Sequence, residues 1–312
     1  MANLSKKIVI RDSTLREGLD VPGVSFSTEQ RLKIAGLINT ANVAEVEIVA
    51  PGRVLKDLEF ARELRKQRLH IKTSGLVYAS GNSWKEEIKE AAGLLDRFDI
   101  LMPVSFQRRP YGRRAKINVM LEVLGAALRY ASNVGVGFPH ATQANIEFLL
   151  MIARLAQQSG AKRLTIYDTN GSSDPFAVKD LVRRIAGVVE VPLFFHAHND
   201  LGLATANSLA AVYGGASGLD TTVNGLGDRA GNAAFEQVAL CLSLKGFSTG
   251  VKMRRILRLS KAVERESGVR NSEIAPVVGN HVFSHKSPGH FENLALFEAY
   301  EPLLIGLKRK RR

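Results

Sequence analysis

Two histidines stand in alternation at the end of a short apolar run, Phe194-Phe-His-Ala-His198. Alternate side chains of an extended strand share one face, so His196 and His198 point the same way. Two imidazoles on one face can share a metal ion, or each can hydrogen-bond to a neighbouring strand. Metal binding is favoured where the pair ends a barrel strand, because barrel enzymes place their active sites at that end.

A site built on two histidines needs oxygen ligands to complete its coordination. Candidates follow two other apolar runs: Asp12 and Glu17 near the N-terminus, and Asp228 and Asn232 in a glycine-rich segment. Residue type alone does not choose between Asp12 and Glu17, or between Asp228 and Asn232. The glycines at 225, 227 and 231 match a dinucleotide fingerprint only loosely and lie far from a first βαβ unit. They predict close backbone approach to a ligand instead.

The elements that must position these residues are eight short runs rich in β-branched and aliphatic side chains. Each run is followed by a stretch with helical periodicity, and successive runs begin roughly 30 residues apart, one βα unit each. They cover residues 8–10, 46–49, 71–77, 99–102, 134–138, 164–167, 192–195 and 219–223. Eight such units predict a closed (β/α)₈ TIM barrel of the α/β class. The first, seventh and eighth strands are then neighbours, so their loops meet above one mouth.

The composition fits such a barrel and limits the classes of partner. The 312 residues are 45% apolar, enough for a sizeable core, and the formal net charge is +13. The charge fits a polyanionic partner such as coenzyme A or nucleic acid, and equally a generally basic, solvated surface. The basic residues are spread over many predicted helices apart from the run 307–312, which is only a weak signal for nucleic acid. The single cysteine, Cys241, and the lack of a signal peptide or apolar membrane-length run predict a cytoplasmic protein without a membrane span.

The βα pattern ends near residue 250, which predicts two parts. Residues 1–250 would form the barrel and residues 251–312 a C-terminal extension. This extension begins with a basic helix to about residue 266. It continues as an irregular tail that holds three of the seven histidines, His281, His285 and His290.

Five motifs, in this order along the chain, resemble a family of metal-dependent barrel enzymes. This family includes the isopropylmalate, homocitrate and citramalate synthases and hydroxymethylglutaryl-CoA lyase. The motifs are Asp12-Ser-Thr-Leu-Arg-Glu-Gly18, Val46-Glu-Ile48, Asp168-Thr-Asn-Gly171, His196-Ala-His-Asn-Asp200 and Thr222-Val-Asn-Gly-Leu-Gly-Asp-Arg-Ala-Gly-Asn232. Each alone is a weak signal, but together they form a specific pattern over roughly residues 7 to 305.

The resemblance implies a ligand set for one divalent ion, Zn²⁺, Mg²⁺ or Mn²⁺. Its members would be Glu17, His196, His198 and Asn232.

The same resemblance implies roles for three residues around the substrate. Arg16 would polarise the substrate carbonyl, Glu47 would orient Arg16, and Thr169 would hold the substrate carboxylate. A 2-oxo acid chelates a metal through its carboxylate and ketone oxygens. The ion and Arg16 would then stabilise the alkoxide that forms when a carbanion attacks the ketone.

Two features favour the synthase branch over the lyases. The lyases carry a cysteine in the loop after the eighth strand, whereas residues 225–232 contain none. The segment 276–290 resembles the synthase region that follows the barrel. By that match His290 is the candidate catalytic base, which would reach into a neighbouring subunit of a homodimer.

Three departures from the family pattern concern the machinery that enolises the thioester. After the fifth strand, residues 137–144 contain no carboxylate, and His140 is the candidate replacement. After the fourth, residues 105–109 introduce positive charge. Arg109 is a candidate for binding an anionic substrate or the coenzyme A phosphates, and a solvated loop is the equal alternative. The chain also ends at Arg312, without the rest of the synthase C-terminal region.

The combined expectation is a metal-dependent condensation of an acyl-CoA, with acetyl-CoA as the expected donor, and a 2-oxo acid. The alternatives are carbon–carbon bond cleavage by a lyase or aldolase of the same family, and a non-catalytic relative that senses a ligand. A metal–enolate site can serve either direction, so the fold does not choose between them.

Overall fold

Eight parallel strands close into a barrel in sequence order, and β8 pairs back onto β1. The computed structural model describes residues 6–50, 54–79, 84–105 and 112–308. The strands are β1 (Val9–Asp12), β2 (Glu45–Val49), β3 (Lys72–Tyr78), β4 (Arg97–Leu101), β5 (Val134–Phe138), β6 (Leu164–Asp168), β7 (Leu193–Ala197) and β8 (Gly218–Thr221). Each of the eight predicted runs forms one of these strands, which confirms the (β/α)₈ barrel.

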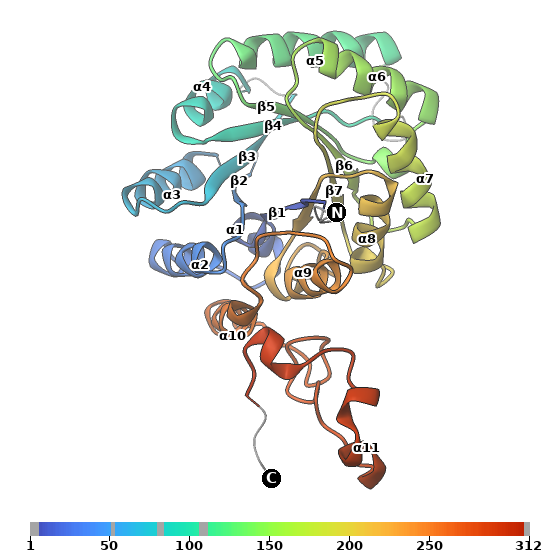
Figure 1. Ribbon diagram of the computed structural model, residues 1–312. Helices are drawn as coiled ribbons and strands as arrows, with labels where there is room; N and C mark the ends of the chain where they lie inside the picture. Colours follow the sequence, from blue (N-terminus) through green and yellow to red (C-terminus); the bar gives the residue numbers. More distant parts are fainter. Residues whose placement is uncertain (1–5, 51–53, 80–83, 106–111, 309–312) are drawn as a thin grey trace, which may run out of the picture.

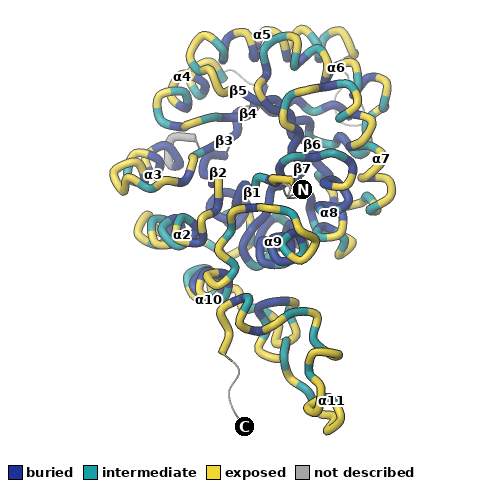
Figure 2. The backbone as a smooth tube through the Cα atoms, viewed as in Figure 1, coloured by how far each residue is buried: buried dark blue, intermediate teal, exposed yellow. Residues whose placement is uncertain are grey.

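Helices follow the strands and form a layer around the barrel (Figure 1). The strands are buried, while the helices expose their outward faces (Figure 2). The helices are α1 (Thr14–Glu17), α2 (Thr28–Thr40), α3 (Val54–Lys66), α4 (Trp84–Leu94), α5 (Arg113–Leu128), α6 (Ile146–Gln158), α7 (Pro175–Ala186), α8 (Ala204–Gly214), α9 (Phe235–Leu244), α10 (Ile256–Ser267) and α11 (Pro288–Glu292). Short 3₁₀ turns include η2 (Ala141–Gln143), η3 (Val223–Gly225) and η4 (Met253–Arg255).

Local sequence signals explain where the helices begin and which face they bury. The Asp174 side chain accepts hydrogen bonds from two backbone N–H groups of α7, and Pro175 takes the first helical position, where its missing N–H costs nothing. In α2, Ile34 and Ile38 recur one turn apart and are fully buried against the barrel. The apolar periodicity of the sequence therefore corresponds to the buried faces of the helices.

Several strand ends near the mouth differ by one or two residues from the predicted ones, and the ends of β1 and β8 bear on the site. β1 continues to Asp12, so Arg16 and Glu17 lie on the single turn of α1 rather than in an open loop. This turn forms because the Ser13 carbonyl accepts the N–H groups of both residues. β8 stops at Thr221, because η3 follows with Asn224 in the left-handed region at φ 62°.

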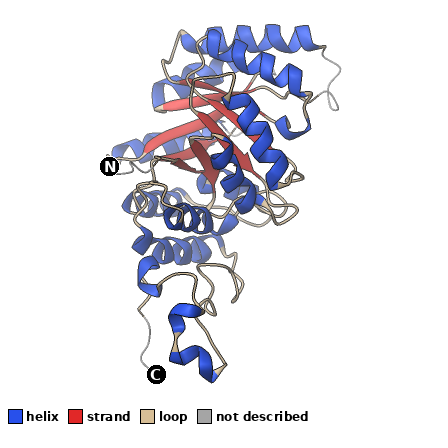
Figure 3. Ribbon diagram, turned by 45° about the vertical axis from the view of Figure 1, so that its right-hand side comes forward, coloured by secondary structure: helices blue, strands red, loops and turns tan. Residues whose placement is uncertain are grey.

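Beyond α10 the chain leaves the barrel. That helix packs against α2, and the chain beyond it hangs to one side of the barrel as irregular structure ending in α11 and short turns (Figures 1 and 3). Much of this tail is exposed (Figure 2). Within the described ranges, no helix combines the length and apolarity needed to cross a membrane.

Candidate metal centre

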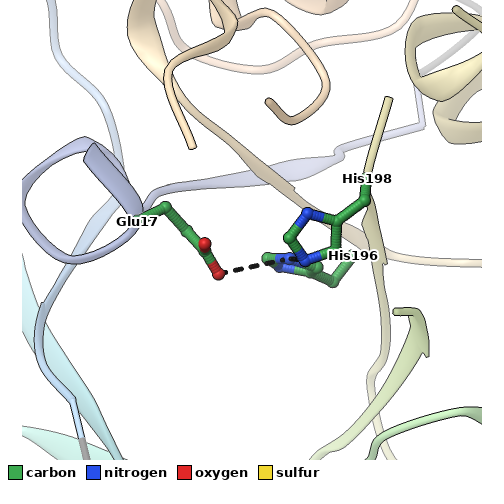
Figure 4. A group of neighbouring side chains, drawn as sticks. All are labelled: Glu17, His196 and His198. Atoms are coloured by element: carbon green, nitrogen blue, oxygen red, sulfur yellow. Dashed lines mark hydrogen bonds and ion pairs between the residues drawn. The ribbon is translucent and has the colours of Figure 1, made fainter. Parts of the chain in front are cut away.

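Three side chains that can bind a metal converge at the mouth of the barrel. Glu17 comes from α1, His196 from β7, and His198 from the residues just after that strand. Their ligand atoms lie within 4.8 Å of one another. Nε2 of His196 is 3.5 Å from Oε1 of Glu17 and 3.4 Å from Nε2 of His198. Figure 4 shows the carboxylate and the two rings turned toward one another.

Asn232 adds an amide to this group. Its Nδ2 is 3.4 Å from Nε2 of His196, and its Oδ1 is buried with no hydrogen-bond partner among the described residues. A Cβ on Gly227 would lie 2.4 Å from that Oδ1, so glycine at 227 leaves room for the amide. A half-turn of the Asn232 amide group exchanges Oδ1 and Nδ2, so either atom can face the histidines. A buried acceptor without a partner fits a fourth ligand of a metal ion.

The charges of the cluster suit a divalent cation. Burial lowers the pKa of His198 to about 3, and neighbouring His196 acts in the same direction, so the ring is neutral and keeps a free lone pair. Burial alone would raise the pKa of Glu17, but Arg16 and the two histidines lower it below its ordinary value. A carboxylate with two imidazoles is a donor set that Zn²⁺ and Mn²⁺ accept and that Mg²⁺ uses in part.

The other oxygen candidates lie apart from the cluster. Both carboxylate oxygens of Asp12 accept hydrogen bonds from Thr14, at 3.0 Å each. Burial raises the pKa of Asp12 to about 7. The Asp228 carboxylate instead pairs with Arg229 at 2.6 Å. The geometry therefore favours Glu17 over Asp12 and Asn232 over Asp228, because Glu17 and Asn232 face the histidines.

Arg16 links the metal cluster to the barrel interior. One of its terminal nitrogens pairs with Glu17 Oε1, and its Nε donates to Glu47 Oε2, which also accepts from the Ser13 hydroxyl at 3.2 Å. Burial disfavours the charge, but Glu17 and Glu47 raise the pKa of Arg16 above its ordinary value. The guanidinium is thus a fixed cation at the edge of the cluster.

Thr169 and His140 meet each other beside the cluster rather than within it. The backbone N–H of His140, in the loop after β5, donates to Oγ1 of Thr169 at 2.8 Å, and the Thr169 carbonyl accepts from Arg229 at 2.8 Å. Arg109 lies outside the described residues.

His290 is not brought to the metal cluster within one chain. It lies on α11, at the far end of the tail (Figure 1), where its ring stacks on Phe297 at a centroid distance of 3.9 Å. Its Nδ1 is 3.2 Å from Nδ1 of His285, and the other ring nitrogen of His285 is 3.2 Å from Glu298.

Sequence reasoning missed two buried residues that touch His196. Tyr167 pairs with it in register, with ring centroids 4.8 Å apart, and the Tyr167 hydroxyl is buried with no partner among the described residues. The carboxylate of Asp220 lies 3.1 Å from His196 Nδ1. Strand alternation within the predicted runs could have revealed both, because it turns their side chains toward the barrel axis.

Known proteins resemble this chain in sequence and in fold. Residues 7–263 match the HMGL-like family model. Homocitrate synthase 1 of a Nostoc species is 33% identical, over 97% of this chain and 82% of that protein. The 2-isopropylmalate synthase of Methanocaldococcus jannaschii is 31% identical, over 99% of this chain and 61% of that protein, so the chain spans less than two thirds of that relative.

A solved structure shares the fold. Hydroxymethylglutaryl-CoA lyase from Pseudomonas aeruginosa superposes with a TM-score of 0.73 at 22% identity, covering 86% of this chain and 96% of that one. Because the family model spans most of the sequence and the relatives align over nearly all of it, the chain belongs to the HMGL-like family of (β/α)₈-barrel enzymes.

Proposed function

We propose that this protein is a metal-dependent acyltransferase that condenses an acyl-CoA, with acetyl-CoA as the expected donor, with a 2-oxo acid. The observation that carries the proposal is the convergence of Glu17, His196 and His198, with the Arg16 guanidinium against Glu17. The relatives named as homocitrate and isopropylmalate synthases support it.

The proposed ligands are Glu17, His196, His198 and the Asn232 amide oxygen. A divalent ion bound there would act as a Lewis acid on the ketone oxygen of the acceptor. Arg16 would donate to the same oxygen and stabilise the negative charge that develops on it, while Glu47 keeps the guanidinium in place. Thr169, in the loop after β6, would hold the acceptor carboxylate.

The donor side of the reaction needs a base. We assign this role to His290 of a second copy in a homodimer, with the extension 251–312 serving to present it and residues 1–250 as the catalytic barrel. The base removes a methyl proton from the acyl thioester, the carbanion forms the new bond to the ketone carbon, and water then cleaves the thioester to release the free thiol. His140, in the loop after β5, would take the place of the missing carboxylate. Arg109 would bind anionic groups of a substrate.

Cleavage by a lyase or aldolase is the second candidate. It is favoured by one observation, the absence of any carboxylate in residues 137–144, where the condensing relatives are expected to carry one. The same metal site can stabilise an enolate in either direction.

One assay separates these functions. The protein is incubated with acetyl-CoA, a divalent ion and a panel of 2-oxo acids, and free thiol is followed. Release that depends on one acceptor and is lost in His198→Ala supports condensation. No release with any acceptor contradicts it, and formation of pyruvate or acetyl-CoA from hydroxy acids or their thioesters then favours cleavage. Metal binding without either activity favours a ligand sensor.

A mixing experiment tests the partner role of His290. His290→Ala and His198→Ala are each expected to be inactive alone. When the two are mixed and allowed to exchange subunits, heterodimers contain one intact composite site, so about a quarter of the unaltered activity should return. No recovery, with heterodimers present by mass spectrometry, would exclude action across subunits.

A further inference from the structure

Asp220 lies between a buried arginine and a proposed metal ligand. Its Oδ2 is 3.1 Å from Nδ1 of His196, and both of its oxygens accept from Arg11, at 2.7 Å from Nε and 2.6 Å from a terminal nitrogen. The three residues come from contiguous strands, β1, β8 and β7, and all are almost completely buried. The carboxylate therefore has one orientation, set by a bidentate pair.

Arg11 is itself held from the opposite side. Its remaining terminal nitrogen donates to Asp99 at 2.9 Å, and Asp99 also accepts two hydrogen bonds from Arg163. A Cβ at Gly135 would lie 2.1 Å from Asp99 Oδ1, so the glycine makes room for this carboxylate. A chain of buried charges thus runs across the barrel and ends at the His196 ring.

The position of Asp220 determines which nitrogen of His196 is free. In the neutral ring, a carboxylate facing Nδ1 selects the tautomer with its proton there, which leaves the lone pair on Nε2. Nε2 is the atom that faces Glu17 and His198, at 3.5 Å and 3.4 Å. His198 lacks such a support, because its Nδ1 is buried with no partner among the described residues.

We propose that Asp220 is the positioning residue of the metal centre: it accepts the Nδ1–H of His196 and so holds Nε2 in the form and direction that bind the ion. This inference rests on the proposed metal site. It adds that the ligands are arranged before an ion binds and that the arrangement comes from the barrel interior, through Arg11, rather than from the mouth.

Two matched variants test the proposal. Asp220→Asn leaves one acceptor where three donors converge, so it removes the constraint on His196. Asp99→Asn removes a carboxylate that also pairs with Arg11 but leaves the Asp220–His196 contact intact. Metal affinity is measured for both by titration calorimetry with Zn²⁺ and Mn²⁺, alongside their thermal unfolding. We expect Asp220→Asn to weaken binding by about 10- to 100-fold and Asp99→Asn by less than about 3-fold.

A second measurement works without any folded variant at Asp220. In the metal-free protein labelled with ¹⁵N-histidine, nitrogen shifts report which ring nitrogen carries the proton, and His196→Ala identifies the signals. At a pH where the His196 ring is neutral, we expect its single proton on Nδ1. A neutral His196 ring with its proton on Nε2, or equal affinity losses in the two variants, would overturn the assignment of Asp220 while leaving the proposed function standing. Failure of the unaltered protein to bind metal would overturn both.

Discussion

The two halves of the barrel mouth differ in the polarity of the side chains that line them. The metal half, on β1, β7 and β8, carries Glu17, His196 and Asp220 in a continuous set of hydrogen bonds and ion pairs. The opposite half, on β3, β4 and β6, presents a small apolar cluster of Leu76, Leu101 and Tyr167 that is separate from the main core.

This difference separates a prearranged part of the site from one that is open to variation. In the metal half, Glu47 holds Arg16 and Asp220 holds His196, so changing one member disturbs its neighbours. In the opposite half the contacts are mostly apolar. A Cβ at Gly137 would lie 2.8 Å from Leu101 and 2.9 Å from Tyr167. This wall is therefore closely packed, and its packing does not depend on paired charges. Two of the three departures from the family pattern also fall in the loops after β4 and β5.

The largest effect is expected from the metal ligands. His198→Ala should abolish stoichiometric metal, measured by elemental analysis, and lower the rate more than about 10³-fold through the loss of Lewis-acid stabilisation. The barrel should remain folded, because the residue lies at the rim. His70→Ala, an exposed histidine before β3, serves as the control and should retain its metal. Unchanged metal content in both His198→Ala and His196→Ala would remove the proposed site.

Arg16 tests whether the metal half acts on the transition state and not only on metal binding. Arg16→Lys keeps the charge but loses the fixed geometry between Glu17 and Glu47. We expect kcat to fall about 10²- to 10³-fold with metal still bound. A rate within threefold of the unaltered protein, at saturating substrate, would exclude the role assigned to this guanidinium.

The buried carboxyl of Glu236 is expected to make the free energy of unfolding depend on pH. Burial raises the pKa of Glu236 from 4.5 to about 7, so the folded protein holds this proton more tightly than the unfolded chain. Stability is then lost as pH rises through about 4.5 to 7. Glu236→Gln removes this loss and should gain about 2 to 3 kcal/mol over the unaltered protein between pH 5 and pH 8. Parallel stability curves for the two proteins over that range would contradict the assignment.

The smallest effect concerns the opposite half. Tyr167→Phe removes a buried hydroxyl that has no partner among the described residues, so the substrate-free protein should gain about 1 kcal/mol of stability. Metal affinity should not change, because the hydroxyl is not a ligand. Denaturant unfolding and calorimetry check the two statements separately, and a clear loss of stability would show that the hydroxyl is already satisfied.

The number and order of the strands could be read from the sequence, because hydrophobic periodicity is a local property. The apolar composition of each short run indicates that the run is buried. Alternation along the seventh run correctly placed His196 and His198 on one inward face. Strand ends were less predictable. The turn of α1 depends on the Ser13 carbonyl and the Asp12 carboxylate, which the apolar pattern does not register.

The sequence also predicted a metal site and the kinds of ligand it needs, because residue type alone identifies the imidazoles and carboxylates that can bind a metal. It could not choose Glu17 over Asp12 from physical reasoning alone, and it overlooked Asp220. Those distinctions arise when β1, β7 and β8 close beside one another and bring together side chains up to 209 positions apart, such as Arg11 and Asp220. A pairing of that kind leaves no local trace, because its energy exists only where the closed barrel excludes water and lets two distant charges meet.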